Sequence, residues 1–482
     1  MDTAERHVSR EPQSSAVISS TPTAPPPADS ARFMLFVVAI AALGGLLFGY
    51  DTGIISSALL DISAEFGLGT FGKQLVTSAI LVGGIVGALG SGPISDRFGR
   101  RRTVLAVAIL FVVGAIGTAV APDAASLVIT RFVLGLAVGA VTQILPVYIA
   151  EVAPAERRGS LVVLFQLMIA GGQLVSYLVG YGIQGHWRWM FALAVIPGAV
   201  LFAGMLRLPE SPRWLVSQGR QDEARGVLAR IRGDHATAAR EVTEIESVHQ
   251  EARGSWADLR RRWVRPALTA AVGISVLCQL TGINAVIYYA PTILTDSGFG
   301  KSASILATIG VGVVLVAMTV VGTFMVDRVG RRRLLLLFIP ASVVALVVLG
   351  AAFLGGDPTG GERWVVVAAM LAYIAFNGGS LSVVIWLLNS EVIPLAVRGK
   401  GTGLASVSMW TSDLLVSLTA LSLIGAIGAS GTFWLYGAVS VFAFFFVLRC
   451  VPETKGRTLE EIENSLHDGT FQPHAARRTV GQ

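Results

Sequence analysis

The sequence predicts an all-α polytopic membrane protein with twelve transmembrane helices in two pseudo-symmetric six-helix bundles. Three observations lead to this fold class. Of the 482 residues, 53% are hydrophobic and 14% are charged, whereas soluble domains carry about 25% charged residues. Twelve apolar segments approach or exceed the roughly 20 residues that a helix needs to cross a bilayer. Charged loop motifs recur between the two halves of the chain.

The apolar segments and their flanks set the order of the elements. Residues 1–32 are rich in Ser, Thr, Pro and Ala, which predicts a disordered cytoplasmic tail. The charged interval 208–263 separates the sixth segment from the seventh, and an amphipathic helical pattern runs through 222–232. Residues 452–482 form a C-terminal tail. The helices of the first bundle (33–207) and the second bundle (264–451) are expected at 33–60, 73–95, 103–121, 126–150, 161–184, 189–207, 264–295, 303–326, 334–354, 364–389, 400–424 and 431–451.

Basic residues in alternate loops predict the orientation. They lie at Arg97, Arg100, Arg101, Arg102, Arg157, Arg158, Arg328, Arg331, Arg332, Arg333, Arg398 and Lys400. Because cytoplasmic loops collect Lys and Arg, we expect both termini and the 208–263 linker in the cytoplasm. The net charge of +6 then reflects orientation in the lipid bilayer of a cell membrane, and no nucleic-acid partner is expected.

Catalytic, cofactor and metal chemistry are not indicated. Cys278 and Cys450 lie in or beside apolar segments, with no metal spacing or disulfide framework. The six histidines lie outside the expected membrane centre, and there is no nucleophile–base set or phosphate loop. We therefore expect neither an enzyme nor a bound cofactor.

Three loop motifs repeat at a nearly constant offset, which predicts a duplicated six-helix unit. Two such halves that face each other would bind a substrate between them near the bilayer midplane. The repeated pairs are Asp-Arg-x-Gly-Arg-Arg-Arg at 96–102 and 327–333, Glu-x-x-Pro-x-x-x-Arg-Gly at 151–159 and 391–399, and Pro-Glu at 209–210 and 452–453.

These residues resemble the major facilitator superfamily (MFS) and, within it, the sugar porter family. The loop motif at 96–102 occurs throughout the superfamily, and other strings are closer to sugar porters. Those strings are Gly49-Tyr50-Asp51-Thr52-Gly53, Pro209-Glu210-Ser211-Pro212-Arg213-Trp214-Leu215, Gly282-Ile283-Asn284, Tyr288-Tyr289-Ala290-Pro291 and Pro452-Glu453-Thr454-Lys455-Gly456. The match runs over about residues 33–466. It implies the MFS fold and transport of a monosaccharide or polyol by alternating access, often coupled to protons.

Asp51 and Arg131 are expected to form a buried pair. Asp51 lies in the outer half of the first segment, and Arg131 lies a few residues into the fourth from outside. Antiparallel helices place both at a similar depth, and intramembrane charges are by default paired and functional. Protonation of Asp51 would release Arg131; a static salt bridge is the alternative. The resemblance favours coupling, because proton symporters of the family have Asp at this position.

A sugar site needs amides that donate and accept hydrogen bonds, together with aromatic faces. Gln166 and Gln173 are seven residues apart on one helix face, and Gly282 permits a helix break between Gln279 and Asn284. By resemblance, the sugar-contacting positions are Gln166, Gln173, Gln279, Asn284, Trp386 and Trp410, and the gate or pocket-wall positions are Phe48, Tyr288 and Tyr289. The alternative role for each polar side chain is an interhelical hydrogen bond.

Four positions depart from the family pattern. Cys278, Leu315 and Met409 stand where amide side chains are frequent, so the pocket should be less polar than a tight hexose site. Asp413 lies one helical turn beyond Trp410, where Asn is common. It is expected either to face the cavity and bind a cationic or amino-bearing substrate, or to pair within the bundle or lie near the membrane surface.

The cytoplasmic motifs are expected to form a latch that favours the outward-facing state, since a charge network can bias a two-state equilibrium. The alternative is that the arginines only set the orientation. In the latch, Asp96, Arg97, Arg100, Glu151 and Arg158 of the first half pair with Asp327, Arg331, Glu391 and Arg398 of the second half.

The leading interpretation is therefore a secondary active transporter that imports a monosaccharide or polyol, functions as a monomer and is coupled to protons, with sodium coupling still open. A facilitative uniporter of the same substrates and an exporter of a small metabolite are the alternatives. The strings at 282–284 and 209–213 argue against the exporter. A nutrient sensor would want a longer cytoplasmic signalling tail than the residues after the last segment.

Overall fold

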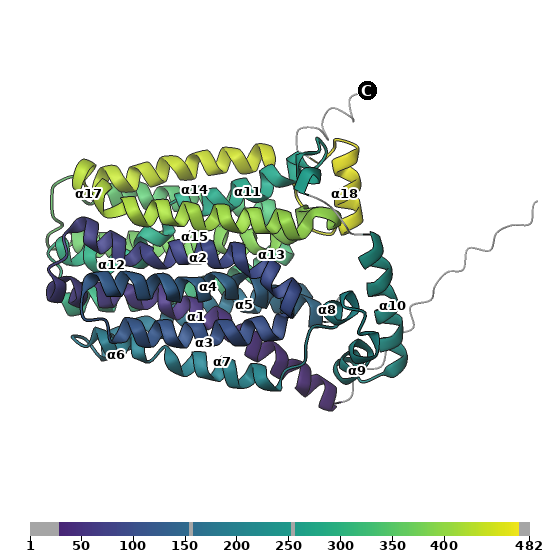
Figure 1. Cartoon of the computed structure of the whole chain (residues 1–482). Helices are drawn as coiled ribbons and strands as arrows, with labels where there is room; N and C mark the ends of the chain where they lie inside the picture. Colours follow the sequence, from purple (N-terminus) through teal and green to yellow (C-terminus); the bar gives the residue numbers. More distant parts are fainter. Residues whose placement is uncertain (1–27, 154–157, 252–255, 472–482) are drawn as a thin grey trace, which may run out of the picture.

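A computed structural model describes residues 28–153, 158–251 and 256–471 of the chain. These residues form helices and connecting loops, and eleven helical stretches among them are long and apolar enough to cross a membrane. Figure 1 shows the long helices running roughly parallel to one another as a single elongated bundle. The all-helical membrane architecture predicted from composition is confirmed.

The last stretch contains two membrane-spanning helices. Helix α17 (Arg398–Cys450) has 53 residues, which would extend about 80 Å at 1.5 Å per residue, whereas the bilayer core is about 30 Å thick. Gly428 interrupts α17 with φ 74° and ψ 168°, and the chain turns back near the α17 label in Figure 1. The twelve-helix fold is therefore confirmed.

The remaining helices of the two bundles follow the predicted segments closely. The first half contains α1 (Ala28–Phe66), α2 (Thr70–Phe98), α3 (Arg100–Ala119), α4 (Ala124–Val152), α5 (Arg158–Gly182), α6 (Trp187–Ala192) and α7 (Val195–Arg207). The second half contains α11 (Arg265–Leu280), α12 (Ile283–Asp296), α13 (Lys301–Val329), α14 (Arg331–Ala351), α15 (Glu362–Gly378), α16 (Leu381–Val392) and α17. The predicted disordered tail was too long: residues 28–32 are helical, and the rest of that tail lies outside the described residues.

Short helices gather at one end of the bundle. They are α8 (Pro212–Ser217), α9 (Gln221–Arg232), α10 (His235–Glu251) and α18 (Leu459–His467), and Figure 1 shows them together at what we call the linker end. The opposite end, which holds the α1–α2, α5–α6 and α12–α13 connections, is the loop end. The amphipathic helix predicted at 222–232 is α9, whose Ala224 and Leu228 pack with Trp214 of α8 and Val242 of α10.

A break in the seventh transmembrane segment brings its polar residues together. Gly282 has φ +90° and separates α11 from α12, as its sequence position predicts. Left-handed φ is natural for glycine, and a Cβ at this position would lie 2.5 Å from ring atoms of Tyr436. The carbonyl of Thr281, freed at the break, accepts a hydrogen bond from the Tyr373 hydroxyl at 2.7 Å. The break is thus satisfied by a neighbouring helix, as bilayer proteins require.

Glycines allow α2 and α4 to pack backbone against backbone. A Cβ on Gly83 would collide with the Phe132 carbonyl, and one on Gly135 would collide with the Ile80 carbonyl. Small residues permit this close approach of two helix backbones. In a membrane, helices associate through van der Waals packing, because no hydrophobic driving force acts between them. The start of α4 is capped by Asp123, which accepts a hydrogen bond from the Ser126 amide at 2.8 Å. That backbone hydrogen bond lowers the pKa of Asp123.

Hydrogen bonds join the two halves on the loop-end side. Ser78 donates to Ser417 at 2.9 Å, and Ser422 donates to Gln74 at 2.9 Å, linking the first turns of α2 to α17. Nearer the surface, the Lys301 ammonium of the second half pairs with the Asp61 carboxylate of the first half. These contacts hold the halves together on that side.

Candidate functional site

A cavity lies between the two halves, where α1 and α5 face α11, α12, α13, α16 and α17. About 650 Å³ in and around it, including space open to solvent, is not filled by protein atoms. Its lining residues are Phe48, Thr52, Gln166, Ile169, Gln173, Cys278, Gln279, Ile283, Asn284, Ile287, Tyr288, Leu315, Ser382, Ile385, Trp386, Met409, Trp410 and Asp413.

Eight of the nine residues predicted to contact or enclose a substrate line this cavity. They are Phe48, Gln166, Gln173, Gln279, Asn284, Tyr288, Trp386 and Trp410. Tyr289 does not line it, so it is not a pocket-wall residue, and its alternative place at a gate stays a prediction. Successive residues on a helix point in directions about 100° apart; with Tyr288 facing the cavity, the Tyr289 hydroxyl instead donates to the Ser417 carbonyl at 2.8 Å.

The amide side chains come from both halves and partly bind one another. Asn284 Nδ2 donates to Gln279 Oε1 at 2.8 Å across the Gly282 break. On the facing side, Gln173 Nε2 donates weakly to Thr52 Oγ1 at 3.4 Å. Each amide still has a donor or acceptor left over, so the cavity presents both kinds of hydrogen-bonding group from opposite walls.

Two aromatic residues add flat apolar surface. Trp410 is buried, and its ring centroid lies 5.3 Å from that of Phe48 in the other half; its indole also packs against Gly84, where a Cβ would lie 2.9 Å from the ring. Trp386 makes an edge contact with Phe165 at 6.4 Å between centroids. Each tryptophan therefore lines the cavity and also contacts an aromatic residue of the other half.

All four positions that depart from the family pattern line the cavity: Cys278, Leu315, Met409 and Asp413. The first three add apolar or weakly polar surface, as expected. Asp413 faces the cavity, with Tyr288 donating to its Oδ2 at 3.0 Å, and it does not lie at the membrane surface.

Sequence reasoning missed several lining residues. Thr52 and Ser382 are polar, and each carried a signal: Thr52 follows Asp51, and Ser382 follows the Gly378-Gly379-Ser380 stretch where α15 gives way to α16. Ile169, Ile283, Ile287 and Ile385 also line the cavity. Aliphatic residues of this kind occur throughout the spans, so sequence offers nothing to single them out.

Asp51 and Arg131 meet as predicted. Both side chains are fully buried in the first half, and Arg131 Nη2 lies 3.6 Å from Asp51 Oδ2. Arg131 Nε also donates to the Val76 carbonyl at 2.9 Å, and its guanidinium lies 5.4 Å from the centre of the Phe191 ring. Thr52, the neighbour of Asp51, lines the cavity, so the pair is one residue away from the substrate wall.

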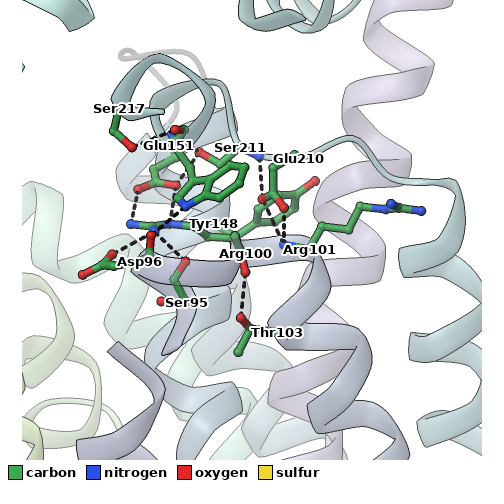
Figure 2. Close-up of polar contacts among 12 residues, drawn as sticks. Ser95, Asp96, Arg100, Arg101, Thr103, Tyr148, Glu151, Glu210, Ser211 and Ser217 are labelled. Atoms are coloured by element: carbon green, nitrogen blue, oxygen red, sulfur yellow. Dashed lines mark hydrogen bonds and ion pairs between the residues drawn. The ribbon is translucent and has the colours of Figure 1, made fainter. Parts of the chain in front are cut away.

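The first copy of the repeated motifs forms a network at the linker end (Figure 2). Arg100 contacts Asp96 at 2.8 Å and Glu151 at 3.2 Å. Glu151 also accepts a hydrogen bond from the Ser211 hydroxyl at 2.5 Å. The backbone amide of Arg101 donates to Glu210 Oε1 at 3.0 Å. The 2–3 loop, the end of α4 and the 209–211 turn are thereby tied together.

The second copy repeats this arrangement. Arg331 contacts Asp327 at 3.3 Å and Glu391 at 2.8 Å. Glu391 accepts from the Thr454 hydroxyl at 2.6 Å, and Glu453 Oε1 accepts from the Arg331 amide at 2.9 Å. The internal repeat inferred from the sequence is therefore also a repeat of contacts.

The expected partners of the latch were wrong in one respect: Arg100 pairs with Asp96 and Glu151 of its own half, and Arg331 likewise pairs within its own half. Each arginine lies at the start of a helix that directly follows its motif loop, so the acids nearest to it belong to the same half. Arg97 is exposed and lies over the Phe98 ring, and Arg398 donates from Nε to the Ile393 carbonyl at 3.2 Å. The side chain of Arg158 lies outside the described residues.

Within the described ranges, no group of three or more His, Cys, Asp or Glu side chains could hold a metal ion. The cavity itself offers amides, the hydroxyl groups of Thr52, Ser382 and Tyr288, the Cys278 thiol, aromatic rings and one carboxylate. Such groups bind a polar, uncharged molecule through hydrogen bonds and stacking.

Known proteins share this arrangement. The family described as "Sugar (and other) transporter" matches residues 37–466. A D-xylose transporter of Levilactobacillus brevis is 42% identical over 92% of this chain and 98% of its own length. The major myo-inositol transporter IolT of Bacillus subtilis is 38% identical over 90% of this chain and 94% of its own.

The fold is shared with solved structures. A structure of the proton:xylose symporter XylE bound to 6-bromo-6-deoxy-D-glucose has a TM-score of 0.78 and 32% sequence identity, covering 90% of this chain and 99% of that one. A partially occluded inward-open structure of XylE from E. coli also has a TM-score of 0.78. With its paired motifs, twelve helices and amide-lined cavity between two halves, this chain belongs to the sugar porter family of the major facilitator superfamily.

Proposed function

We propose that this protein imports a monosaccharide or polyol across the cell membrane by alternating access, in symport with protons. The observation that carries the proposal is the cavity between the halves, in which four amide side chains and two tryptophans face one another. A sugar presents hydroxyl groups that both donate and accept, and C–H faces that stack on aromatic rings. The relatives named for D-xylose and myo-inositol support this substrate class.

The two halves, 33–207 and 264–451, are the units that move against each other. The cavity takes lining residues from both, so a substrate at its centre would bridge them. We assign Gln166, Gln173, Gln279, Asn284, Trp386 and Trp410 to substrate contact. Phe48 and Tyr288 form the surrounding wall. Because one chain supplies the whole cavity, a monomer in the lipid bilayer is sufficient for transport.

Proton coupling is assigned to Asp51 and Arg131. A buried ion pair at 3.6 Å loses its attraction when the carboxylate takes up a proton, and the guanidinium is then left without a counterion. Arg131 is held to α2 through the Val76 carbonyl, and Thr52 next to Asp51 faces the cavity. A change at the pair can therefore reach both the helix packing and the substrate wall. The name of XylE as a proton:xylose symporter supports this assignment.

The linker-end networks are proposed to hold each half rigid as it moves. Arg100 with Glu151, and Arg331 with Glu391, tie helix ends within a half. We expect the remaining latch residues (Asp96, Arg97, Arg158, Asp327 and Arg398) to act at the same surface. Asp96 and Asp327 are largely exposed, and exposed ion pairs are individually weak, so their effect on the balance of states comes from the network.

The test is uptake of labelled D-xylose, D-glucose and myo-inositol into proteoliposomes, with and without an inward proton gradient. A symporter accumulates its substrate only when the gradient is present. A facilitative uniporter equilibrates the same sugar with or without the gradient. That result would rule out proton coupling by Asp51 and Arg131, but it would still support a monosaccharide or polyol as the substrate. An exporter would show no uptake of any of the three.

A further inference from the structure

A basic segment, residues 256–265, lies directly before the seventh transmembrane segment at the linker end. Its sequence is Trp-Ala-Asp-Leu-Arg-Arg-Arg-Trp-Val-Arg, with a net charge of +3. It begins with the short helix η2 (Trp256–Arg260), and its last residue, Arg265, is the first of α11. The transmembrane stretch Arg265–Asp296 has 32 residues and extends at most about 48 Å at 1.5 Å per residue. Because a bilayer with its headgroup regions is about 40–45 Å thick, the basic segment lies at the depth of the headgroups.

Buried side chains fix the basic segment in place. Leu259 and Val264 are buried, and η2 packs against α11 and α17. The Trp263 ring stacks on the ring of His467 in α18, with 4.0 Å between the ring centroids. The segment is therefore a folded part of the second half, and its remaining side chains are held in a defined arrangement.

Those remaining side chains point outward. Arg260, Arg261 and Arg262 are exposed, and Trp256 is 63% exposed. Arg261 pairs with Asp258 at 2.7 Å. In the part of the chain that the structure describes, the side chains of Arg260 and Arg262 have no ion-pair or hydrogen-bond partner. Two adjacent guanidinium groups are therefore left to bind an anion.

We propose that residues 256–265 bind the anionic headgroups of phospholipids in the leaflet at the linker end. A planar guanidinium group matches the oxygens of a phosphate, and basic clusters directly beside a transmembrane helix attract anionic lipids. Apolar surface for the acyl chains lies beside these charges. It is supplied by the Trp256 ring and by Leu395, which is 46% exposed on η3 (Leu395–Val397), a turn that packs against η2.

A preference for anionic lipid distinguishes this site from basic residues that only set the orientation of the chain. Arginines with that role need no particular headgroup and no fixed arrangement. Here the charges are arranged around one aromatic ring, since the Lys400 ammonium also lies 6.0 Å from the centre of the Trp256 ring. Because Arg265 begins α11, a bound headgroup holds at a fixed depth the helix that carries Gln279 of the cavity.

The fluorescence of Trp256 tests the proposal, because bromine on a lipid acyl chain quenches a tryptophan that it contacts. The full chain is reconstituted in phosphatidylcholine bilayers with the same small fraction of brominated phosphatidylglycerol or brominated phosphatidylcholine. The Trp256 signal is the difference between each protein and the same protein with Trp256→Phe. In wild type, phosphatidylglycerol should quench this signal with about fivefold or greater preference, as expected when at least one arginine contributes. Arg260→Gln/Arg262→Gln should lower the preference to about twofold or less.

Arg225→Gln/Arg240→Gln is the matched control. It removes the same charge from exposed arginines of α9 and α10 and should keep the wild-type preference. If Arg260→Gln/Arg262→Gln fails to fold, each single variant should still lose part of the preference. Inorganic phosphate, added at constant ionic strength, should leave the preference unchanged; its loss would mean that the arginines bind free phosphate and would overturn the lipid site. Equal quenching by the two lipids in wild type overturns it too, as does an equal loss of preference in the control.

Discussion

Arg131 Nη2 lies 3.6 Å from Asp51 Oδ2, and neither side chain is exposed. At this distance the two groups attract without an ideal hydrogen bond, and both carboxylate oxygens lack a hydrogen-bond donor among the described residues. A buried carboxylate held by charge alone is well placed to exchange its charge for a proton. Substitution of this pair is therefore the most direct way to test proton coupling.

Asp51→Asn mimics a permanently protonated carboxyl group. We expect it to abolish accumulation of sugar against a gradient while preserving exchange of labelled for unlabelled sugar across the membrane, because exchange needs no net proton movement. Counterflow and gradient-driven uptake, measured in the same proteoliposomes, separate the two activities. Asp296→Asn, which changes an exposed carboxylate, should retain both. Full gradient-driven accumulation by Asp51→Asn would show that coupling lies elsewhere.

Gln279→Ala and Asn284→Ala should each weaken sugar binding by about twofold to tenfold, which corresponds to about 0.5–1.5 kcal/mol for one hydrogen bond. Because Asn284 donates to Gln279, the two substitutions should not be additive. Sugar affinities of wild type, the two single variants and the double variant are measured by quenching of tryptophan fluorescence. Together they form a double-mutant cycle. Gln218→Ala lies outside the transmembrane helices and provides the control. Additive losses would mean that the two amides act independently.

Gly282→Ala should destabilise the protein. A left-handed residue with a Cβ costs about 1–2 kcal/mol, and the methyl group would also press against the Tyr436 ring. A lower midpoint of thermal unfolding in detergent is the expected result. Gly403→Ala is the matched control, since a Cβ there meets nothing within 4 Å. Equal midpoints for the two variants would contradict the account of the helix break.

Lys301→Gln should open the loop-end side of the cavity, because Lys301 pairs with Asp61 of the other half. Cys278 lines the cavity and reports on access. In a Cys450→Ser background, a membrane-impermeant maleimide applied from the loop-end side should label Cys278 several-fold faster in Lys301→Gln than in the parent. Lys73→Gln, near the same surface, should leave the rate unchanged. An unchanged rate in Lys301→Gln would mean that the ion pair does not hold the halves together.

Much of the fold could be predicted because membrane helices need long apolar segments and their loops carry regular charge. The break at Gly282 was predictable, because glycine is common where the chain adopts left-handed φ. The interruption between α15 and α16, and the one between α6 and α7, were not predicted. A short break inside an apolar segment leaves the composition of that segment unchanged. Only the break between α15 and α16 has a sequence signal, the stretch Gly378-Gly379-Ser380.

The candidate site was predicted well where chemistry narrows the choice of residue. Amides and tryptophans inside apolar helices have few roles, and Gln166, Gln279 and Trp386 line the cavity as expected. The sequence could not tell which of Tyr288 and Tyr289 lines the cavity, because two neighbouring aromatic residues look alike in sequence while helix geometry turns them to different faces. The partners of Arg100 were also misassigned: a repeated motif reveals two equivalent loops but does not say which acids each loop contacts.

The most direct test of the central claim is uptake of labelled sugar by wild-type proteoliposomes at equal sugar concentrations on both sides, with and without an inward proton gradient. The account predicts that D-xylose, D-glucose or myo-inositol accumulates inside only when the gradient is imposed, and that an uncoupler abolishes the accumulation. Equilibration of the label without accumulation when the gradient is imposed, or no uptake of any of the three sugars, would contradict it.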